Sequence, residues 1–244
     1  LNEIIKLDET KAAGIKLFLG SSTGNMLVDN EIVIKKIFSN TSLPIAVHCE
    51  DESIIKKNLF ECIKTFGDDI PIEKHSEIRS EEACYLSSSK AIKLAKETGA
   101  RLHVFHLSTA KETFLFKNDQ PLTSKKITSE VCVHHLLFSE DDYQEKGAYI
   151  KWNPSIKKAS DREELWKALT DNRIDILATD HAPHTLEEKQ NPYTSAPSGG
   201  PLVQHALIAL LTEAKKGKIT LEKLVEKACH NPAILFKIQN RGYL

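Results

Sequence analysis

Short apolar runs alternate with longer amphipathic stretches along this chain, and that alternation constrains the fold more than any other feature of the sequence. The apolar runs have the length of strands, and the stretches between them are long enough for helices. Five strands are expected, at residues 14–19, 43–49, 101–107, 126–133 and 174–179. Strict alternation of this kind predicts an α/β fold with a parallel sheet and helices on its outer faces.

The stretches between the expected strands carry helical signals. A long helix is expected over residues 81–98, ended by Gly99, the residue type that most often stops a helix. Ser160 and Glu163 form a capping-box pattern that opens a helix reaching residue 169. Further helices are expected over residues 30–38, 53–66, 108–116, 202–215 and 221–228. Residues 190–201, rich in Pro, Ser and Gly, form a long loop, and such loops are usually functional.

Composition and charge exclude several classes of protein. The 244 residues include 33 basic and 34 acidic side chains, and the formal charge of −1 gives no electrostatic footprint for nucleic acid or an anionic membrane. There is no run of about 18 apolar residues that would span a bilayer. The five cysteines are odd in number, widely spaced and never in a CxxC pair, which predicts a reducing, cytoplasmic setting.

Four residues suited to a metal site lie toward the carboxyl ends of the expected strands: Lys16 on the first, His48 on the second, His106 on the third and Asp180 after the fifth. In a parallel α/β barrel these ends converge on one face, where active sites form. Histidine and carboxylate ligands suit Zn²⁺ and related divalent ions. Each residue alone also has a structural explanation, such as a hydrogen-bonded histidine, a lysine stem over apolar surface or a turn-capping aspartate. The joint pattern favours the metal site.

One segment resembles a known signature. Residues 178–184 read ATDHAPH, which resembles the signature of dihydroorotases, cyclic amidohydrolases of the amidohydrolase superfamily. Further segments are similar to other parts of the same family, at residues 16–25, 46–51, 103–109, 129–137, 153–154, 185–189 and 196–201. The resemblance keeps the family's order from about residue 14 to residue 232, nearly the whole chain.

The resemblance implies a metal-dependent (β/α)8 barrel and gives the four strand-end residues their roles. Lys16 looks like the lysine that carbon dioxide carboxylates in many family members, and a lysine carbamate can bridge two cations. His48 and His106 would ligate the second metal, while Asp180 would touch the first metal and shuttle a proton. The implied cofactor is Zn²⁺, one or two ions per subunit.

Histidine ligands usually need a hydrogen-bond acceptor on the ring nitrogen that does not face the metal. Glu50 and Asp51, which follow His48, and Glu130 on the fourth expected strand are candidates for that acceptor. Each of these acids has an alternative place at the surface or at a helix start. Cys49, beside His48, is interpreted as a small buried hydrophobe.

The activity implied by the resemblance is that of a dihydroorotase, which reversibly hydrolyses the cyclic amide of (S)-dihydroorotate to N-carbamoyl-L-aspartate in de novo pyrimidine biosynthesis. His184 and Asn153 would hold the carboxylate and ring of this small-molecule substrate. The loop at residues 21–25 resembles a segment that closes over substrate, with Thr23 as the contact. Family members are commonly dimeric, so a homodimer is implied, with no nucleic-acid or membrane partner.

Two alternative functions stay open. A dihydropyrimidinase, hydantoinase or allantoinase shares the barrel and the metals, although the Ala-Pro-His run after Asp180 favours a substrate that bears a carboxylate. A non-catalytic dihydroorotase-like subunit, which stabilises a partner enzyme, is the alternative from another class. The retained ligand residues argue against that second alternative.

The chain departs from the family pattern at the first metal site. The family's first strand carries a His-x-His pair and a nearby Arg, and no His-x-His occurs in these 244 residues. The five expected strands correspond to strands four to eight, so residues 1–244 are expected to be a partial barrel domain that lacks the N-terminal strands and the C-terminal β-rich segment. Because Leu1 is not an initiator Met, a natural N-terminus is not expected. The chain alone is expected to be inactive.

Overall fold

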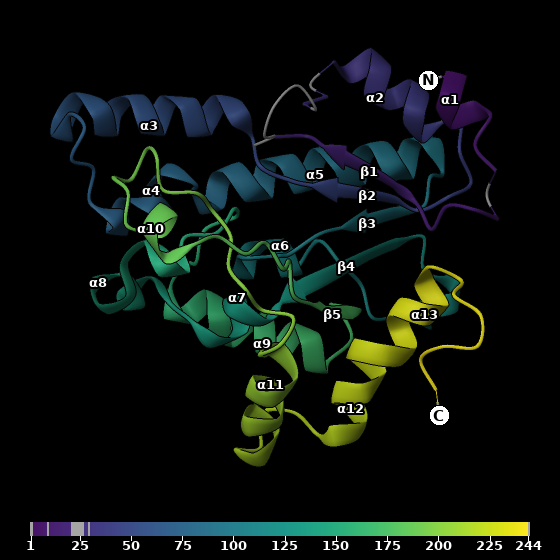
Figure 1. Cartoon of the computed structure of the whole chain (residues 1–244). Helices are drawn as coiled ribbons and strands as arrows, with labels where there is room; N and C mark the ends of the chain where they lie inside the picture. Colours follow the sequence, from purple (N-terminus) through teal and green to yellow (C-terminus); the bar gives the residue numbers. More distant parts are fainter. Residues whose placement is uncertain (1, 9, 21–26, 29, 244) are drawn as a thin grey trace.

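One parallel sheet organises the chain. The computed structural model describes residues 2–8, 10–20, 27–28 and 30–243. Its five strands are paired in the order β1-β2-β3-β4-β5, and every pair is parallel (Figure 1). The strands are β1 (Ile15–Phe18), β2 (Ile45–His48), β3 (Leu102–Val104), β4 (Ile127–Cys132) and β5 (Ile176–Ala178). Each predicted strand contains the observed one, and this order is that of neighbouring units in a (β/α)8 barrel, so the predicted fold class is confirmed.

Helices connect the strands. They are α1 (Asn2–Ile5), α2 (Glu31–Phe38), α3 (Glu52–Phe66), α4 (His75–Ile78), α5 (Glu81–Thr98), α6 (Ala110–Thr113), α7 (Val133–Leu137), α8 (Tyr143–Lys146), α9 (Ala159–Thr170), α10 (Leu186–Lys189), α11 (Ala206–Lys215), α12 (Leu221–Val225) and α13 (Asn231–Leu235). Short 3₁₀ turns lie at Ile72–Lys74, Leu122–Ser124, Glu140–Asp142 and Gly147–Ile150, and a π-helical turn lies at Glu226–His230. Within the described ranges, no helix is both long and apolar enough to cross a membrane.

Local capping sets the ends of the longest helix. The Ser80 side chain accepts a hydrogen bond from the Ala83 N–H, and Gly99 adopts a left-handed conformation with φ of 74°. The prediction for residues 81–98 is therefore confirmed at both ends.

Other helix predictions differ in their boundaries. The helix predicted over residues 202–215, for example, begins only at Ala206. The helix predicted over residues 108–116 is confined to α6, and Thr109 sets its start by accepting from the Glu112 N–H. The α9 helix begins one residue before Ser160, and the acid that reaches back to the helix start is Asp161, which accepts from the Lys158 N–H. Asp161 also accepts from the Ala110 N–H of α6, a contact between distant segments that the local sequence pattern does not contain.

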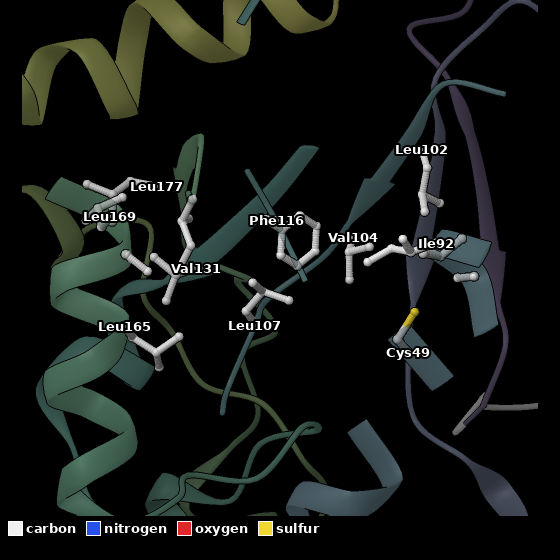
Figure 2. Close-up of a cluster of buried hydrophobic side chains, with 14 of the residues drawn as sticks. Cys49, Ile92, Leu102, Val104, Leu107, Phe116, Val131, Leu165, Leu169 and Leu177 are labelled. Carbon is white, nitrogen blue, oxygen red and sulfur yellow. The ribbon is translucent and has the colours of Figure 1, made fainter. Parts of the chain in front are cut away.

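The two faces of the sheet differ in chemistry because side chains alternate along a strand. On the face toward the helices, apolar strand residues join one buried core with α5 and α9. Figure 2 shows Val131 and Leu177 of this core beside Leu165 and Leu169 of α9. The pairing register places a different set together on the opposite face, namely Lys16, His48, His103, Thr128 and Glu130.

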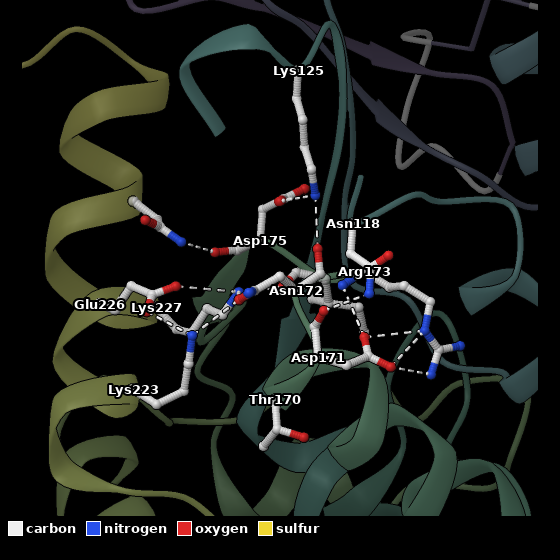
Figure 3. Close-up of polar contacts among 12 residues, drawn as sticks. Asn118, Lys125, Thr170, Asp171, Asn172, Arg173, Asp175, Lys223, Glu226 and Lys227 are labelled. Atoms are coloured by element: carbon white, nitrogen blue, oxygen red, sulfur yellow. Dashed lines mark hydrogen bonds and ion pairs between the residues drawn. The ribbon is translucent and has the colours of Figure 1, made fainter. Parts of the chain in front are cut away.

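A polar network closes the amino-terminal end of β5. The Lys125 ammonium lies 2.7 Å from the Asp175 carboxylate, and both side chains are buried. The Lys227 ammonium donates to the Ile174 carbonyl at 2.7 Å and to the Asn172 amide oxygen at 2.9 Å (Figure 3). In α/β barrels the amino-terminal end of the strands serves stability, so the candidate site belongs to the other end.

Candidate active site

Two candidate ligands sit just past the carboxyl ends of their strands in an unusual backbone conformation. His106 follows β3 with φ of 35°, and Asp180 follows β5 with φ of 45°. Residues other than glycine rarely occupy this left-handed region, where the strain costs about 1–3 kcal/mol and is concentrated at functional sites. His48 is the last residue of β2. The structure therefore places three of the four predicted strand-end residues at the carboxyl edge of the sheet.

The rings of His48 and His106 meet at this edge. His48 Nδ1 lies 3.0 Å from His106 Nε2, and both side chains are buried. Two nitrogens bound to one tetrahedral Zn²⁺ at about 2.0–2.1 Å would lie about 3.3–3.4 Å apart. The pair thus has nearly the spacing that two ligands of a single divalent ion require.

A buried carboxylate supports the first of these rings. Glu50 Oε2 lies 2.8 Å from His48 Nε2, and the Arg79 guanidinium donates to the same oxygen. Burial by itself raises the pKa of Glu50, but Arg79 and His48 outweigh burial, so the pKa of this carboxyl falls below its usual range. Of the three candidate acceptors, Glu50 is therefore the one that contacts His48.

The other two predicted acceptors have different partners. Asp51 caps α3 by accepting from the Ser53 and Ile54 N–H groups. Glu130 Oε2 lies 3.0 Å from Nε2 of His103, which is not one of the predicted ligands. Asp51 therefore takes its alternative place, at the start of a helix, and Glu130 contacts a histidine other than a predicted ligand.

His106 has the protonation state that a ligand needs. Burial, and then the neighbouring His48 ring, lower the pKa of His106 to about 4, while Asp180 and nearby glutamates act weakly in the opposite direction. The ring is therefore neutral near pH 7, as metal coordination requires. Its Nδ1 atom is buried and has no hydrogen-bond partner among the described residues.

The remaining two predicted ligands lie farther out. Lys16 is exposed on β1, with its ammonium 4.6 Å from the centroid of the Phe18 ring and 5.4 Å from that of Phe105. Asp180 is exposed at the rim. In the part of the chain that the structure describes, no three His, Cys, Asp or Glu side chains gather closely enough to hold a metal. His48 and His106 thus fit a metal as a two-nitrogen donor set.

The predicted substrate residues are spread over two loops. Asn153 Oδ1 accepts a hydrogen bond from Ser198 Oγ at 3.0 Å, which joins the segment after β4 to the Pro/Ser/Gly-rich loop. His184 is half-buried, with Nδ1 3.7 Å from a carboxylate oxygen of Glu188. Thr23, with the rest of the predicted closing loop, lies outside the described residues.

Two buried lysines that sequence reasoning missed fix that long loop. The Lys151 ammonium donates to the Tyr193 and Ala196 carbonyls, each at 2.6 Å. The Lys189 ammonium donates to the Gly199 carbonyl at 2.8 Å. Burial lowers the pKa of each lysine to about 8. No sequence signal marks them, because lysines in a polar segment normally indicate surface.

Arg79 is a second residue that sequence reasoning missed. It follows α4 and connects two parts of the site, since its side chain reaches Glu50 and its carbonyl accepts from Ser155 Oγ at 3.0 Å. Ser155 lies two residues after Asn153. The available signal was weak: an arginine at the end of a short helix gives no indication of a buried partner.

The chain is similar to known proteins in sequence and in fold. A model of the amidohydrolase family matches residues 6–244. A dihydroorotase of Halobacterium salinarum is 31% identical over 94% of this chain and 52% of its own length. The chain therefore spans about half the length of the curated relatives it matches.

Solved structures share the fold. An L-hydantoinase (dihydropyrimidinase) from Arthrobacter aurescens superimposes with a TM-score of 0.90 at 27% identity, over 100% of this chain and 55% of that protein. A Saccharomyces cerevisiae dihydroorotase, solved in complex with 5-fluoroorotic acid, gives a TM-score of 0.74 at 19% identity, over 95% of this chain and 64% of that one. At that identity the second similarity concerns the fold alone.

Proposed function

The chain belongs to the amidohydrolase family, and from that premise we propose that it forms part of a dihydroorotase. The reaction is the reversible hydrolysis of the cyclic amide of (S)-dihydroorotate to N-carbamoyl-L-aspartate, a step of pyrimidine biosynthesis. The observation that carries the proposal is the buried His48–His106 pair, with ring nitrogens 3.0 Å apart, in a chain 31% identical to a dihydroorotase.

The proposed cofactor is Zn²⁺, one or two ions per subunit, for which His48 Nδ1, His106 Nε2, Asp180 and a carboxylated Lys16 would be the ligands. The two histidines would lie at the second metal and Asp180 at the first. When bound, Zn²⁺ would supply a Lewis acid and a water whose pKa is lowered toward about 7. Asp180 would accept the proton of that water and return it to the leaving ring nitrogen. Its exposed position at the rim supports this role, because a proton shuttle must reach substrate that enters from solvent.

The proposed substrate contacts lie around the same edge. His184 and Asn153 would hold the carboxylate and ring, and Thr23 would contact the substrate from the closing loop. The Lys151 and Lys189 ammonium groups support this arrangement, because they hold the loop that carries Ser198, the hydrogen-bond partner of Asn153. Positioned polar groups of this kind give a concave site its specificity.

We also propose that residues 1–244 are a partial barrel domain, completed by strand units that carry a His-x-His pair. The sheet supports this, since its five described strands leave β1 and β5 as outer strands rather than closing on each other. The apolar face of α11 supports it as well, because Leu207, Ile208 and Leu211 are exposed. Neighbouring barrel units would cover both features.

The decisive experiment is a substrate comparison with the protein that joins these residues to a His-x-His segment. Dihydroorotate, hydantoin and allantoin are assayed side by side, and dihydroorotate is expected to turn over fastest. Absence of dihydroorotate turnover refutes the proposal. An intact mass near 27 kDa for a fully active enzyme would refute the partial-domain proposal instead.

The second candidate function is a hydantoinase or dihydropyrimidinase. The observation that favours it is the L-hydantoinase structure, which superimposes over the whole chain. The substrate comparison separates the two functions. A non-catalytic dihydroorotase-like subunit is tested by metal analysis of the same protein, since fewer than about one metal per chain would favour that inert role.

The proposal includes a homodimer in the cytoplasm. The five cysteines support a reducing setting, because each is free and three of them, Cys49, Cys84 and Cys132, are buried. Burial raises the pKa of the Cys49 thiol to about 12, which fits an inert packing role. Light scattering of the purified protein tests the dimer.

A further inference from the structure

We propose that Arg79 is a positioning residue of the metal site. Its guanidinium holds the Glu50 carboxylate, and Glu50 in turn holds the His48 ring so that Nδ1 faces His106. This inference rests on the proposed metal-dependent function and adds to it a residue 29 positions along the chain from Glu50. Arg79 touches no candidate ligand itself, so it acts through Glu50.

Arg79, Glu50 and His48 form a continuous series of contacts. Glu50 Oε2 receives both His48 Nε2, at 2.8 Å, and the Arg79 Nη1 group. Glu50 is completely buried, and the Arg79 side chain is only 14% exposed. Because one carboxylate oxygen takes both contacts, the position of the guanidinium sets the position of the oxygen to which the imidazole points.

The directions of these hydrogen bonds determine which nitrogen of His48 is free to bind a metal. A carboxylate accepts only, so His48 Nε2 must carry the hydrogen that it directs at Glu50. In the neutral ring the lone pair then lies on Nδ1, the atom 3.0 Å from His106 Nε2. Hydrogen bonds of this kind fix the tautomer and the orientation of metal-binding histidines.

A buried carboxylate depends on a cationic partner. Removing one member of a buried ion pair leaves an uncompensated charge, which is strongly destabilising. Without Arg79, Glu50 would be expected to turn toward water, and the Nε2–H of His48 would lose its fixed acceptor. The ring would then be free to present either nitrogen to the metal.

The backbone of Arg79 is itself held in place. Its N–H donates to the His75 carbonyl at 3.0 Å, and its carbonyl accepts from Ser155 Oγ at 3.0 Å. In addition, His75 Nε2 lies 2.7 Å from the Trp152 carbonyl. The segment around α4 is thus attached to both sides of Asn153, so the candidate metal ligands and a candidate substrate residue share one anchor.

The test compares three variants of the protein that joins these residues to a His-x-His segment. Arg79→Met removes the charge, Arg79→Lys keeps a charge without the planar fork, and Arg173→Met is the matched control. The Arg173 side chain is also 14% exposed and pairs with Glu164 and Asp171. Arg173 and Asp171 belong to the polar network of Figure 3. Circular dichroism first checks that each variant is folded.

Two readouts are measured. Zn²⁺ affinity, from competition with a chromophoric chelator, is expected to fall about 10- to 100-fold in Arg79→Met, less in Arg79→Lys and not at all in Arg173→Met. Nitrogen-15 NMR of the metal-free chain reports the His48 tautomer. It is expected to show Nε2–H in the parent and in Arg173→Met, and a mixture in Arg79→Met.

The outcomes separate this inference from the proposed function. Parent tautomer and parent Zn²⁺ affinity in Arg79→Met would overturn the positioning role. If the tautomer changes but the parent joined protein binds no Zn²⁺, the positioning role stands and the metal-dependent function fails. If Arg79→Met does not fold, Arg79→Lys decides, and parent values for both readouts in that variant overturn the proposal.

Discussion

The carboxyl edge of the sheet has two halves of different character. At β2 and β3, His48 and His106 are about 5% exposed, Glu50 is completely buried, and the three side chains are joined by hydrogen bonds. At β5, Asp180 and the residue after it, His181, are exposed. We call these the buried half and the open half.

The difference in exposure indicates that the two halves have different roles in the site. The buried half is organised by the protein's own contacts, because Glu50 holds the His48 ring and the His48 ring contacts the His106 ring. The side chains of the open half are exposed, so they can reach what binds there. A site needs both, since ligands must be preorganised while the shuttle and the substrate contacts must be reachable.

The largest expected effect tests the rigidity of the buried half. A Cβ added at Gly20 would lie 1.8 Å from the Glu50 carbonyl oxygen, a backbone atom that cannot move aside easily. Gly20→Ala is expected to lower the free energy of unfolding by about 3 kcal/mol in urea titrations. Gly67→Ala is the control, since nothing lies within 4 Å and only its φ of 61° is strained; it should cost about 1 kcal/mol. Equal losses of unfolding free energy in the two variants would mean that the backbone around Gly20 and Glu50 shifts easily to make room.

The second prediction compares one ligand from each half. His106→Gln is expected to weaken Zn²⁺ binding more than about 100-fold, beyond the range seen for outer partners of a metal ligand. Asp180→Asn is expected to weaken it less, because an amide oxygen still coordinates weakly but cannot shuttle a proton. In the complete protein Asp180→Asn should therefore lose more rate than metal. Parallel loss of both would make Asp180 primarily a ligand.

The third prediction concerns the pH dependence that burial creates. Burial lowers the pKa of His135 to about 3, below its ordinary value of 6.5. Between these values the unfolded chain binds a proton that the folded chain does not, so stability falls as the pH drops from about 6.5 toward 3. Between pH 8 and pH 5, the free energy of unfolding of His135→Gln should fall by about 2 kcal/mol less than that of the parent protein. Urea unfolding at both pH values measures it, and an unchanged loss would show that His135 is not buried in solution.

The smallest expected effect is at exposed Lys16. Lys16→Ala is expected to weaken metal binding about tenfold, less than His106→Gln, since the carbamate would be lost while both buried ring nitrogens remain. Added short carboxylic acids should partly restore binding. Unchanged binding and activity would remove Lys16 from the site and leave the buried half as the whole of the described metal site.

Much of the fold was predictable because its signals are local. The 81–98 helix was found to the residue, since Ser80 and Gly99 act on their own neighbours. The start of α9 was missed by one residue because Asp161, and not Glu163, accepts from the N–H at the helix start. Asp161 is also fixed by the Ala110 N–H of α6, a distant contact that the local pattern does not contain. Prediction failed where the position of a side chain depends on a partner that is distant in sequence.

The candidate site divides in the same way. His48 and His106 were predicted because strand ends of a parallel sheet converge on one edge, whichever side chains they carry. Arg79, Lys151 and Lys189 were not predicted, since each acts through a contact with a residue or carbonyl well removed along the chain. Sequence periodicity contains no information about such pairs.

The alternation of strands and helices, and the meeting of metal-type side chains at one edge, could be read from the sequence because both follow from local spacing. Which acid serves which histidine depends on how the elements pack. Glu50 and Asp51 are neighbours in the chain, yet Glu50 bonds His48 while Asp51 caps α3, and Glu130 bonds His103. The physical reason is that a hydrogen bond depends on distance and direction between side chains, and those are set only when the strands and helices pack.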